Sequence, residues 1–400
     1  MNPFLTRRAS RAIHVGSIAV GGDAPVSVQS MTCTPTADVG ATAAQINALA
    51  EAGCDIVRVA VPDIEAAKAI AAIKKQVTLP LIADIHFDYR LAIAAVKAGA
   101  DGLRINPGNI GGDKKVRQVA ACANDHAVPI RIGVNAGSLE KDLVRCHGAT
   151  AEAMVESALR QIQRLESLGF DRIKVSLKAS DVGRTVAAYR LLAERSDVPL
   201  HLGVTEAGGL FGGIVKSALG IGMLLAEGIG DTIRVSLTRD PVEEVRVGHE
   251  ILKALGIRRR GPEFISCPTC GRCQIAVQQI AAQVEEALWK RPLPITVAVM
   301  GCAVNGPGEA KEADVGIAGG QGKGILFKKG RVVKTVEEKD LVRELLAAVE
   351  ELAAEKQAPG TPERIRKIAT RSTRGTRKNV ASTHRQRRGK EIRSNNGSSG

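Results

Sequence analysis

A strand followed by a helix, repeated eight times, is the feature that most restricts how this sequence can fold. Short runs rich in β-branched residues alternate with Ala/Leu/Glu-rich stretches of helical spacing, such as 41–52, 64–75 and 151–168. The runs are residues 26–30, 55–61, 81–87, 102–106, 130–135, 172–177, 200–205 and 232–237. This alternation is typical of α/β folds and predicts a parallel sheet whose crossover connections are helices.

Eight units favour a closed (β/α)8 TIM barrel over an open, doubly wound sheet. No G-x-G-x-x-G motif follows the first strand, so the usual signature of a dinucleotide-binding open sheet is missing. In a closed barrel the carboxyl ends of all strands meet at one face, where the site is expected.

Five of the predicted strands share one local pattern, in which a cation stands between two apolar residues. The triplets are Val57-Arg58-Val59, Leu103-Arg104-Ile105, Ile130-Arg131-Ile132, Ile173-Lys174-Val175 and Ile233-Arg234-Val235. Because side chains alternate faces along a strand, the cations point into the barrel and the apolar residues pack outward. The same parity joins Arg104 with Asn106, Arg131 with Asn135, Lys174 with Ser176 and Lys178, Arg234 with Ser236, and Asp84 with His86.

A ring of inward cations predicts a polyanionic ligand. A single such Arg is as well explained by a structural ion pair, but five cations repel one another and are costly to bury without counter-charge. Arg suits bidentate phosphate contact, and the glycine-rich loops 107–112, 135–138 and 206–209 let backbone N–H groups approach a ligand. We therefore expect a small phosphorylated or diphosphorylated substrate, with Glu206 either a general acid/base or a loop carboxylate paired with a neighbouring cation.

The net charge of +14 is concentrated at one end of the chain. Residues 361–400 hold 12 Lys/Arg and 2 Asp/Glu, so only four of the net positive charges belong to the rest. We interpret 358–400 as a basic, disordered tail. Aromatic residues make up only 2%, which disfavours base stacking on single-stranded nucleic acid. The sequence also shows no membrane span and no secretion signal, and we expect a cytoplasmic protein.

A second, small α+β domain is predicted after the barrel domain 1–257, within residues 258–357. It contains Cys267, Cys270 and Cys273 in a short segment and Cys302 in a Gly/Pro loop. Thiols at this spacing can hold either a structural zinc or an iron–sulfur cluster, and the spacing does not decide between them. The other cysteines, Cys33, Cys54, Cys122 and Cys146, are interpreted as small buried apolar residues.

Long stretches of the chain resemble the 4-hydroxy-3-methylbut-2-en-1-yl diphosphate synthase family of the non-mevalonate isoprenoid pathway, in its two-domain bacterial form. The resemblance covers roughly residues 8 to 353. It rests on VQSMT (28–32), ADIHFDYR (83–90), LRINPGNIG (103–111), IGVNAGSLE (132–140), TEAGG (205–209), CPTC (267–270) and GCAVNGPGE (301–309).

The resemblance implies a TIM barrel followed by a domain with a [4Fe–4S] cluster. By motif match the cluster ligands fall on Cys267, Cys270, Cys302 and Glu309. The implied reaction opens 2-C-methyl-D-erythritol 2,4-cyclodiphosphate reductively and removes a hydroxyl as water, with two electrons from reduced flavodoxin or ferredoxin. Substrate-binding positions fall on Arg58, Arg104, Asn106, Arg131, Asn135 and Lys174, and Glu206 matches the proposed proton donor. Cys273 departs from the family pattern. It could compete with Glu309 for the fourth iron, but we interpret it as a bystander because Glu309 keeps its motif spacing.

Chain topology predicts a head-to-tail homodimer. The last barrel helix runs antiparallel to the strands, so the metal domain leaves from the face opposite the substrate mouth. A short linker cannot carry the cluster round a barrel about 40–50 Å across to its own mouth. A neighbouring subunit would supply it, as the resemblance also implies. One alternative function is a zinc-stabilised phosphate-binding barrel without redox chemistry. Another is a nucleic-acid binder that acts through the basic tail.

Overall fold

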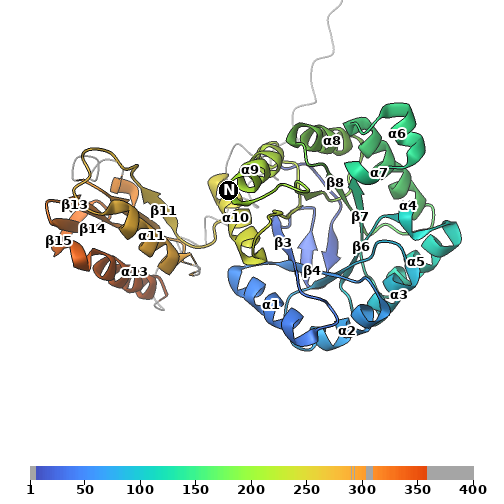
Figure 1. Cartoon of the computed structure of the whole chain (residues 1–400), viewed down its shortest axis with the longest axis horizontal. Coiled ribbons are helices and arrows are strands. Elements are labelled where there is room, and N and C mark those ends of the chain that lie inside the picture. The colour runs from blue at the N-terminus through green and yellow to red at the C-terminus, as the bar shows by residue number, and fades with distance from the viewer. Residues whose placement is uncertain (1–5, 290, 292, 303–309, 358–400) are drawn as a thin grey trace, which may run out of the picture.

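Eight parallel strands form the barrel that the repeat predicts (Figure 1). The computed structural model describes residues 6–289, 291, 293–302 and 310–357. The barrel strands are β3 (Ser27–Met31), β4 (Ile56–Ala60), β5 (Leu81–Asp84), β6 (Gly102–Ile105), β7 (Ile130–Asn135), β8 (Ile173–Lys178), β9 (His201–Leu202) and β10 (Thr232–Ile233). Hydrogen bonding runs in the order β8-β7-β6-β5-β4-β3-β10-β9, and a parallel bridge from Val175 to Leu200 joins the two ends. The sheet therefore closes on itself.

Helices surround the barrel, and five of them begin at an Asp whose carboxylate accepts a backbone N–H bond. The main barrel helices are α1 (Val39–Ala52), α2 (Ile64–Lys74), α3 (Tyr89–Lys97), α5 (Asp113–Asp125), α7 (Ala151–Glu166), α8 (Val182–Arg195), α9 (Leu210–Ala226) and α10 (Pro241–Ala254). The capping residues are Asp38, Asp63, Asp88, Asp181 and Asp240. Such caps satisfy N–H groups that the first helical turn leaves unpaired. Short helices α4 (Pro107–Ile110) and α6 (Lys141–His147) lie in the loops after β6 and β7.

The apolar residues that flank the inward cations pack outward as predicted. Val57, Val59, Leu103 and Ile105 are buried in one continuous core between the strands and the helices. A small hairpin that was not predicted packs on the amino-terminal end of the barrel. Its strands are β1 (Ile13–Val15) and β2 (Ile18–Val20), and it packs on Ile56 and Ile82.

A five-stranded sheet and the helices packed on it form the described part of the second domain, at the left of Figure 1. Its strands, in spatial order, are β11 (Glu263–Ser266), β12 (Thr296–Met300), β13 (Val315–Gly320), β14 (Lys323–Lys328) and β15 (Arg331–Glu337). β11, β12 and β13 are parallel, and β14 and β15 are antiparallel. Helices α11 (Val277–Leu288) and α13 (Leu341–Gln357) bury one face of the sheet. The short edge strand β11 was not predicted.

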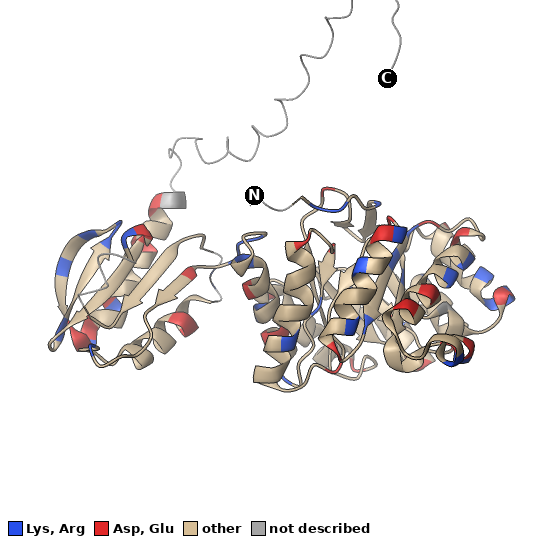
Figure 2. Cartoon of the chain, turned by 90° about the horizontal axis from the view of Figure 1, so that it is seen from above, with Lys and Arg blue, Asp and Glu red and all other residues tan. Residues whose placement is uncertain are grey.

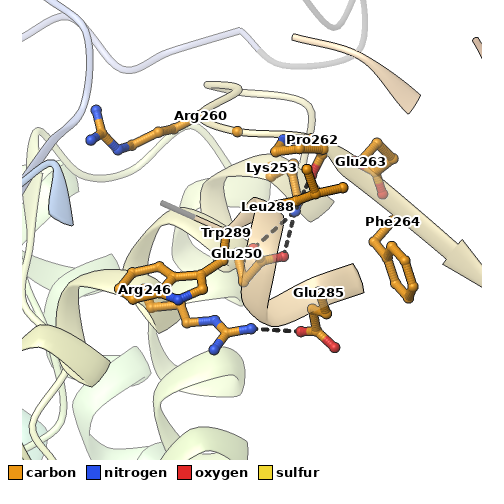
Figure 3. A pocket seen from close by; sticks show the side chains of 11 residues that line it. Arg246, Glu250, Lys253, Arg260, Pro262, Glu263, Phe264, Glu285, Leu288 and Trp289 are labelled. Atoms are coloured by element: carbon orange, nitrogen blue, oxygen red, sulfur yellow. Dashed lines mark hydrogen bonds and ion pairs between the residues drawn. The ribbon is translucent and has the colours of Figure 1, made fainter. Parts of the chain in front are cut away.

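The linker between the domains leaves from the amino-terminal face of the barrel, as the topology predicted. Arg258 forms an ion pair with Asp55, which directly precedes β4, at 2.6 Å. A further contact joins the two domains: Arg246 of α10 donates to Glu285 of α11 at 2.7 Å, and its guanidinium lies 5.2 Å from the Trp289 ring centroid (Figure 3). The second domain is thus attached beside the barrel, away from its mouth.

No helix in the described ranges is long and apolar enough to span a membrane. Lys, Arg, Asp and Glu are interspersed along the ribbons of both domains (Figure 2). The predicted tail 358–400 lies outside the described residues.

Candidate functional site

A polar cavity of about 150 Å³ opens at the carboxyl ends of the barrel strands. Its walls consist almost entirely of inward-facing strand residues and of the residues that directly follow the strands. They are Arg58, Asp84, His86, Arg104, Arg131, Asn135, Ser176, Lys178, Thr205, Arg234 and Ser236. Five cations and one carboxylate therefore surround a space suited to a small anion.

Asp84 is the carboxylate at the centre of this ring. It lies 3.1 Å from Arg104 Nη1 and 3.6 Å from Arg58 Nε, and Arg104 also contacts His86 Nε2 at 3.2 Å. Burial by itself would raise the pKa of Asp84, but Arg58, the His86 hydrogen bond and Arg104 together hold this pKa well below its usual range. Asp84 is therefore ionised and fixes the two guanidinium groups.

A second built-in counter-charge comes from outside the sheet. Glu244 of α10 is buried and lies 3.3 Å from Arg234 Nη2. It also accepts a hydrogen bond from the Leu237 backbone N–H at 3.0 Å and from the Ser30 hydroxyl at 3.1 Å. Two carboxylates of the protein, Asp84 and Glu244, thus neutralise part of the positive charge of the ring. The sequence had led us to expect this negative charge from the ligand alone.

Two cations of the cavity remain without an acidic partner among the described residues. Arg131 donates from Nη1 to the Ser176 hydroxyl at 2.7 Å, while its Nε and Nη2 atoms are buried without a hydrogen bond. Burial, followed by repulsion from other cations, lowers the pKa of Arg131 and that of Lys178. A bound anion would remove this repulsion, so these two side chains mark where negative charge is best accommodated.

The structure brings together four of the predicted substrate-binding residues, Arg58, Arg104, Arg131 and Asn135. Gly133 makes room for this arrangement, because a Cβ atom there would come within 2.5 Å of Arg104 Nε. Any larger residue at position 133 would therefore collide with the Arg104 side chain.

The other two predicted contacts lie elsewhere. Asn106 caps the short helix α4, where its side-chain oxygen accepts from the Gly108 backbone N–H at 3.1 Å. Lys174 lies deeper in the barrel, opposite Arg131 on the neighbouring strand, and its Nζ is buried without a hydrogen bond among the described residues. Burial, then the charge of Arg131, lowers the pKa of Lys174 to about 7.

Lys178, Arg234, Ser176 and Ser236 line the cavity, although they were not among the residues assigned to substrate binding. The period-two parity of their strands already pointed them inward, so the signal was present in the sequence. Parity does not show how deep in the barrel each side chain lies. Lys178 lines the cavity at the mouth, whereas Lys174 lies below it.

Glu206 follows β9 at the rim of the mouth, next to the cavity residue Thr205. It is exposed, and its backbone adopts a left-handed conformation with φ of 52°. A non-glycine residue in this region is uncommon, and such outliers gather at functional sites. The Glu206 carboxylate thus lies in the predicted loop. No hydrogen bond or ion pair to another described residue holds its side chain in place.

The predicted thiol site lies where two parallel strands of the second domain end. Cys267 follows β11, and the adjacent strand β12 leads into Gly301 and Cys302. Gly301 donates its backbone N–H to Cys267 Sγ at 3.1 Å, and a Cβ atom at Gly301 would lie 2.6 Å from Cys273 Sγ. Sulfur-directed N–H groups suit thiolates that carry iron.

The described residues include three of the four predicted cluster ligands, and these three differ in exposure. Cys302 is buried, Cys267 is half-buried and Cys270 is exposed. No three His, Cys, Asp or Glu side chains converge into a metal-binding group among the described residues, and Glu309 lies outside them. Backbone contacts therefore hold the two cysteine-bearing loops together. The fourth predicted ligand, Glu309, lies outside the described residues.

The four other cysteines do not share one environment, which corrects our interpretation of them. Cys54 is buried, and burial raises the pKa of its thiol to about 12. Cys122 is half-buried, whereas Cys33 and Cys146 are exposed. Cys33 lies beyond the end of β3 at Met31 and accepts a hydrogen bond from Gln45 at 3.0 Å.

Comparison with known proteins matches both domains to one family. A family model described as the GcpE TIM-barrel domain matches residues 10–249, and the GcpE protein C-terminal domain matches 263–351. Two relatives carry the name 4-hydroxy-3-methylbut-2-en-1-yl diphosphate synthase (flavodoxin). That of Geobacter sulfurreducens is 63% identical over 87% of this chain and 99% of its own length. That of Desulfotalea psychrophila is 58% identical over 88% of this chain and 98% of its own.

Among solved structures, a dihydropteroate synthase from Xanthomonas albilineans is 18% identical, with a TM-score of 0.43 over 62% of this chain and 100% of that chain. A likeness at this level adds nothing to the assignment. The two family models and the high identity over nearly the full length of the relatives decide it. The chain belongs to the GcpE family, the family of these diphosphate synthases.

Proposed function

We propose that this chain catalyses the reductive opening of 2-C-methyl-D-erythritol 2,4-cyclodiphosphate to 4-hydroxy-3-methylbut-2-enyl diphosphate, with loss of water. The observation that carries the proposal is the mouth cavity, where five cations surround a space of about 150 Å³. A small cyclic diphosphate supplies the missing negative charge. The synthase name of the relatives agrees, and it does not favour a zinc-stabilised barrel without redox chemistry.

In this proposal the cavity residues bind and orient the diphosphate. Arg58, Arg104 and Arg131 offer guanidinium groups, and Asn135 offers an amide. Lys178, Arg234 and the two serines beside them join this set because they line the same cavity. Asn106 acts through the loop that it caps, and Lys174 contributes charge from below.

Glu206 is the proposed proton donor to the departing hydroxyl. Its place at the rim next to Thr205 leaves the carboxyl in contact with solvent, from which it can be reprotonated after each turnover. The strained backbone at this residue supports a functional role.

Cys267, Cys270 and Cys302 are the proposed protein thiolates of a [4Fe–4S] cluster, with Glu309 as the fourth ligand. When bound, the cluster supplies the two electrons one at a time. Support comes from the thiol loops that meet at Gly301 and from the N–H group aimed at Cys267 Sγ. Flavodoxin, which the names of the relatives specify, is the proposed donor, with ferredoxin as the alternative.

We propose that the working unit is a head-to-tail homodimer in the cytoplasm. The linker leaves from the face opposite the mouth, so a partner subunit is better placed to bring its cluster domain to the cavity. Helix α9 also exposes an apolar stripe at every fourth residue, Phe211, Val215, Leu219 and Met223, of which Phe211 is 85% exposed. A face of this kind is typical of a protein–protein contact.

Anaerobic purification with iron and sulfide analysis, combined with turnover under a strong reductant, tests the function. A brown protein with broad absorption at about 400 nm that converts the cyclic diphosphate supports it. A colourless protein with one bound zinc and no turnover refutes it. Deletion of residues 361–400 separates the enzyme from a nucleic-acid binder, because activity is expected to survive.

A further inference from the structure

Cys273 is the one thiol of the second domain to which the proposed function gives no task. It lies at the end of a tight turn, where its backbone N–H donates to the Cys270 carbonyl at 3.0 Å. The next residue, Gln274, donates its N–H to the Gly301 carbonyl at 2.9 Å. These two bonds fix the Cys273 backbone against the loop that carries Cys302.

The Cys273 sulfur shares one small space with the Cys267 sulfur. A Cβ atom built on Gly301 would lie 2.6 Å from Cys273 Sγ and 3.5 Å from Cys267 Sγ. Both sulfur atoms therefore approach Gly301 from the side that a side chain would occupy. Any larger residue at position 301 would have to displace the Cys273 sulfur.

Cys270 differs from this pair although its spacing from Cys267 is that of a redox dithiol. Its side chain is exposed, whereas Cys267 and Cys273 are half-buried and pack against the same apolar core as α11 and α13. The three atoms nearest to a Cβ at Gly301 belong to Cys273 and Cys267. The described geometry thus pairs Cys267 with the third thiol of the segment, six positions along the chain.

We propose that Cys267 and Cys273 form a reversible disulfide when the site holds no cluster. The inference rests on the proposed cluster site, because Cys267 is also one of its ligands. Iron bound to Cys267 blocks the reaction, and loss of the cluster exposes the thiol to its neighbour. Both sulfur atoms lie within 3.5 Å of the same point beside Gly301, and they have to approach each other to form a sulfur–sulfur bond of about 2 Å.

The oxidant is a low-molecular-weight disulfide such as glutathione disulfide. One protein thiolate attacks it and displaces one glutathione thiolate, which leaves a mixed disulfide on the protein. The second protein thiolate attacks the protein sulfur of that bond and displaces the second glutathione. Two protein thiols are oxidised to one disulfide, and one glutathione disulfide is reduced to two thiols, which take up the two protons.

The Cys267–Cys273 disulfide would protect the proposed cluster ligand Cys267 from irreversible oxidation. A free thiol oxidised beyond sulfenic acid is lost irreversibly, whereas a disulfide returns to two thiols under a reductant. The Cys267–Cys273 bond therefore protects the cluster-free chain until iron and sulfide are restored.

Peptide mapping of the full-length protein tests the proposal. Anaerobically purified protein is divided, one half is depleted of iron with a chelator, and both are treated with glutathione disulfide, quenched in acid and alkylated. Trypsin cuts after Arg272, so Cys273 leaves on a different peptide from Cys267 and Cys270. We expect a cross-linked pair of these peptides, two hydrogens lighter than their sum, in the iron-depleted half and its loss after reduction.

Three Cys→Ser variants show which thiols form the cross-link. Cys273→Ser is expected to lose the cross-link and to carry glutathione on Cys267 instead, whereas Cys270→Ser keeps the cross-link. Cys146→Ser, which removes an exposed thiol of the barrel domain, leaves the peptide map of this segment unchanged. A bond from Cys267 to Cys270 or Cys302 in the wild-type protein, with Cys273 alkylated, overturns the proposal. The mapping needs no turnover, so its outcome is independent of the proposed reaction.

Discussion

Asp84 and Arg104 form a buried ion pair at the bottom of the mouth cavity, with 3.1 Å between Oδ1 and Nη1. Arg58 approaches the same carboxylate from the neighbouring strand at 3.6 Å. Asp84 therefore holds two of the cations that would otherwise repel each other in the empty cavity.

Replacement of Asp84 by Asn is expected to lower the free energy of unfolding by about 3 kcal/mol, because it leaves buried guanidinium groups uncompensated. Urea denaturation measures the loss. The cyclic diphosphate should restore more stability to this variant than to the wild type, since it supplies the missing charge. Asp142→Asn is the control, because Asp142 pairs with Arg160 on the surface and its loss should change little. Equal stability of the Asp84 variant and the wild type without ligand would contradict this account.

Lys178→Gln tests which barrel cation meets the substrate. Lys178 lines the cavity, whereas Lys174 lies below it on the same strand. Loss of one charge-assisted hydrogen bond is expected to raise KM about 10- to 100-fold. Steady-state kinetics under a chemical reductant measures this, and Lys174→Gln should raise KM less. The reverse order would place the substrate deeper than the cavity suggests.

Lys174 predicts a pH dependence of stability. Burial lowers its pKa from 10.5 to about 7, so the unfolded chain binds more protons than the folded chain between these two pH values. The free energy of unfolding should therefore rise with pH through this window, on the order of 2 kcal/mol between about pH 7 and 9 from Lys174. Below this window the penalty for the buried charge is complete, and above it the penalty is gone.

Lys174→Met keeps the length of the side chain and removes its charge. Urea denaturation at both pH values should show a shallower rise for this variant than for the wild type. Other buried bases, such as Lys178 and His201, are common to both proteins and cancel in the difference. Identical rises would show that Lys174 does not titrate in this window.

The sequence predicted the barrel and the inward ring because both depend on local patterns. Period-two alternation sets the face on which Arg104 and Arg131 lie, whatever the rest of the fold does. Strands as short as β9 and β10 were found because each belongs to a repeat unit, although two residues alone carry little signal.

What the sequence could not supply depends on contacts between distant segments. Glu244 of α10 contacts Arg234, and Cys273, in the loop after β11, lies against Gly301 at the end of β12. Neither relationship follows from spacing along the chain. The hairpin Ile13–Val20 was missed for a related reason, since its three-residue strands acquire an apolar face only when they cover the barrel end.

The last prediction concerns the proposed sharing of active sites between subunits. A Glu206→Ala chain keeps its thiol site, and a Cys302→Ala chain keeps its mouth, but each is expected to be inactive alone. If the cavity of one chain works with the cluster domain of the other, a hybrid dimer contains one intact site. Random exchange then restores about one quarter of wild-type turnover, because half of the dimers are hybrids with half of their sites intact.

Native mass spectrometry of differently tagged chains establishes that hybrids have formed. A mixture of Glu206→Ala with Arg131→Ala provides the matched control, because both changes lie in the barrel domain and each hybrid site then retains one defect. Turnover should return in the first mixture and stay absent in the second. Hybrids that form fully in the first mixture without regaining turnover would mean that each barrel works with its own cluster domain, which the linker at the opposite face would then have to carry round the barrel.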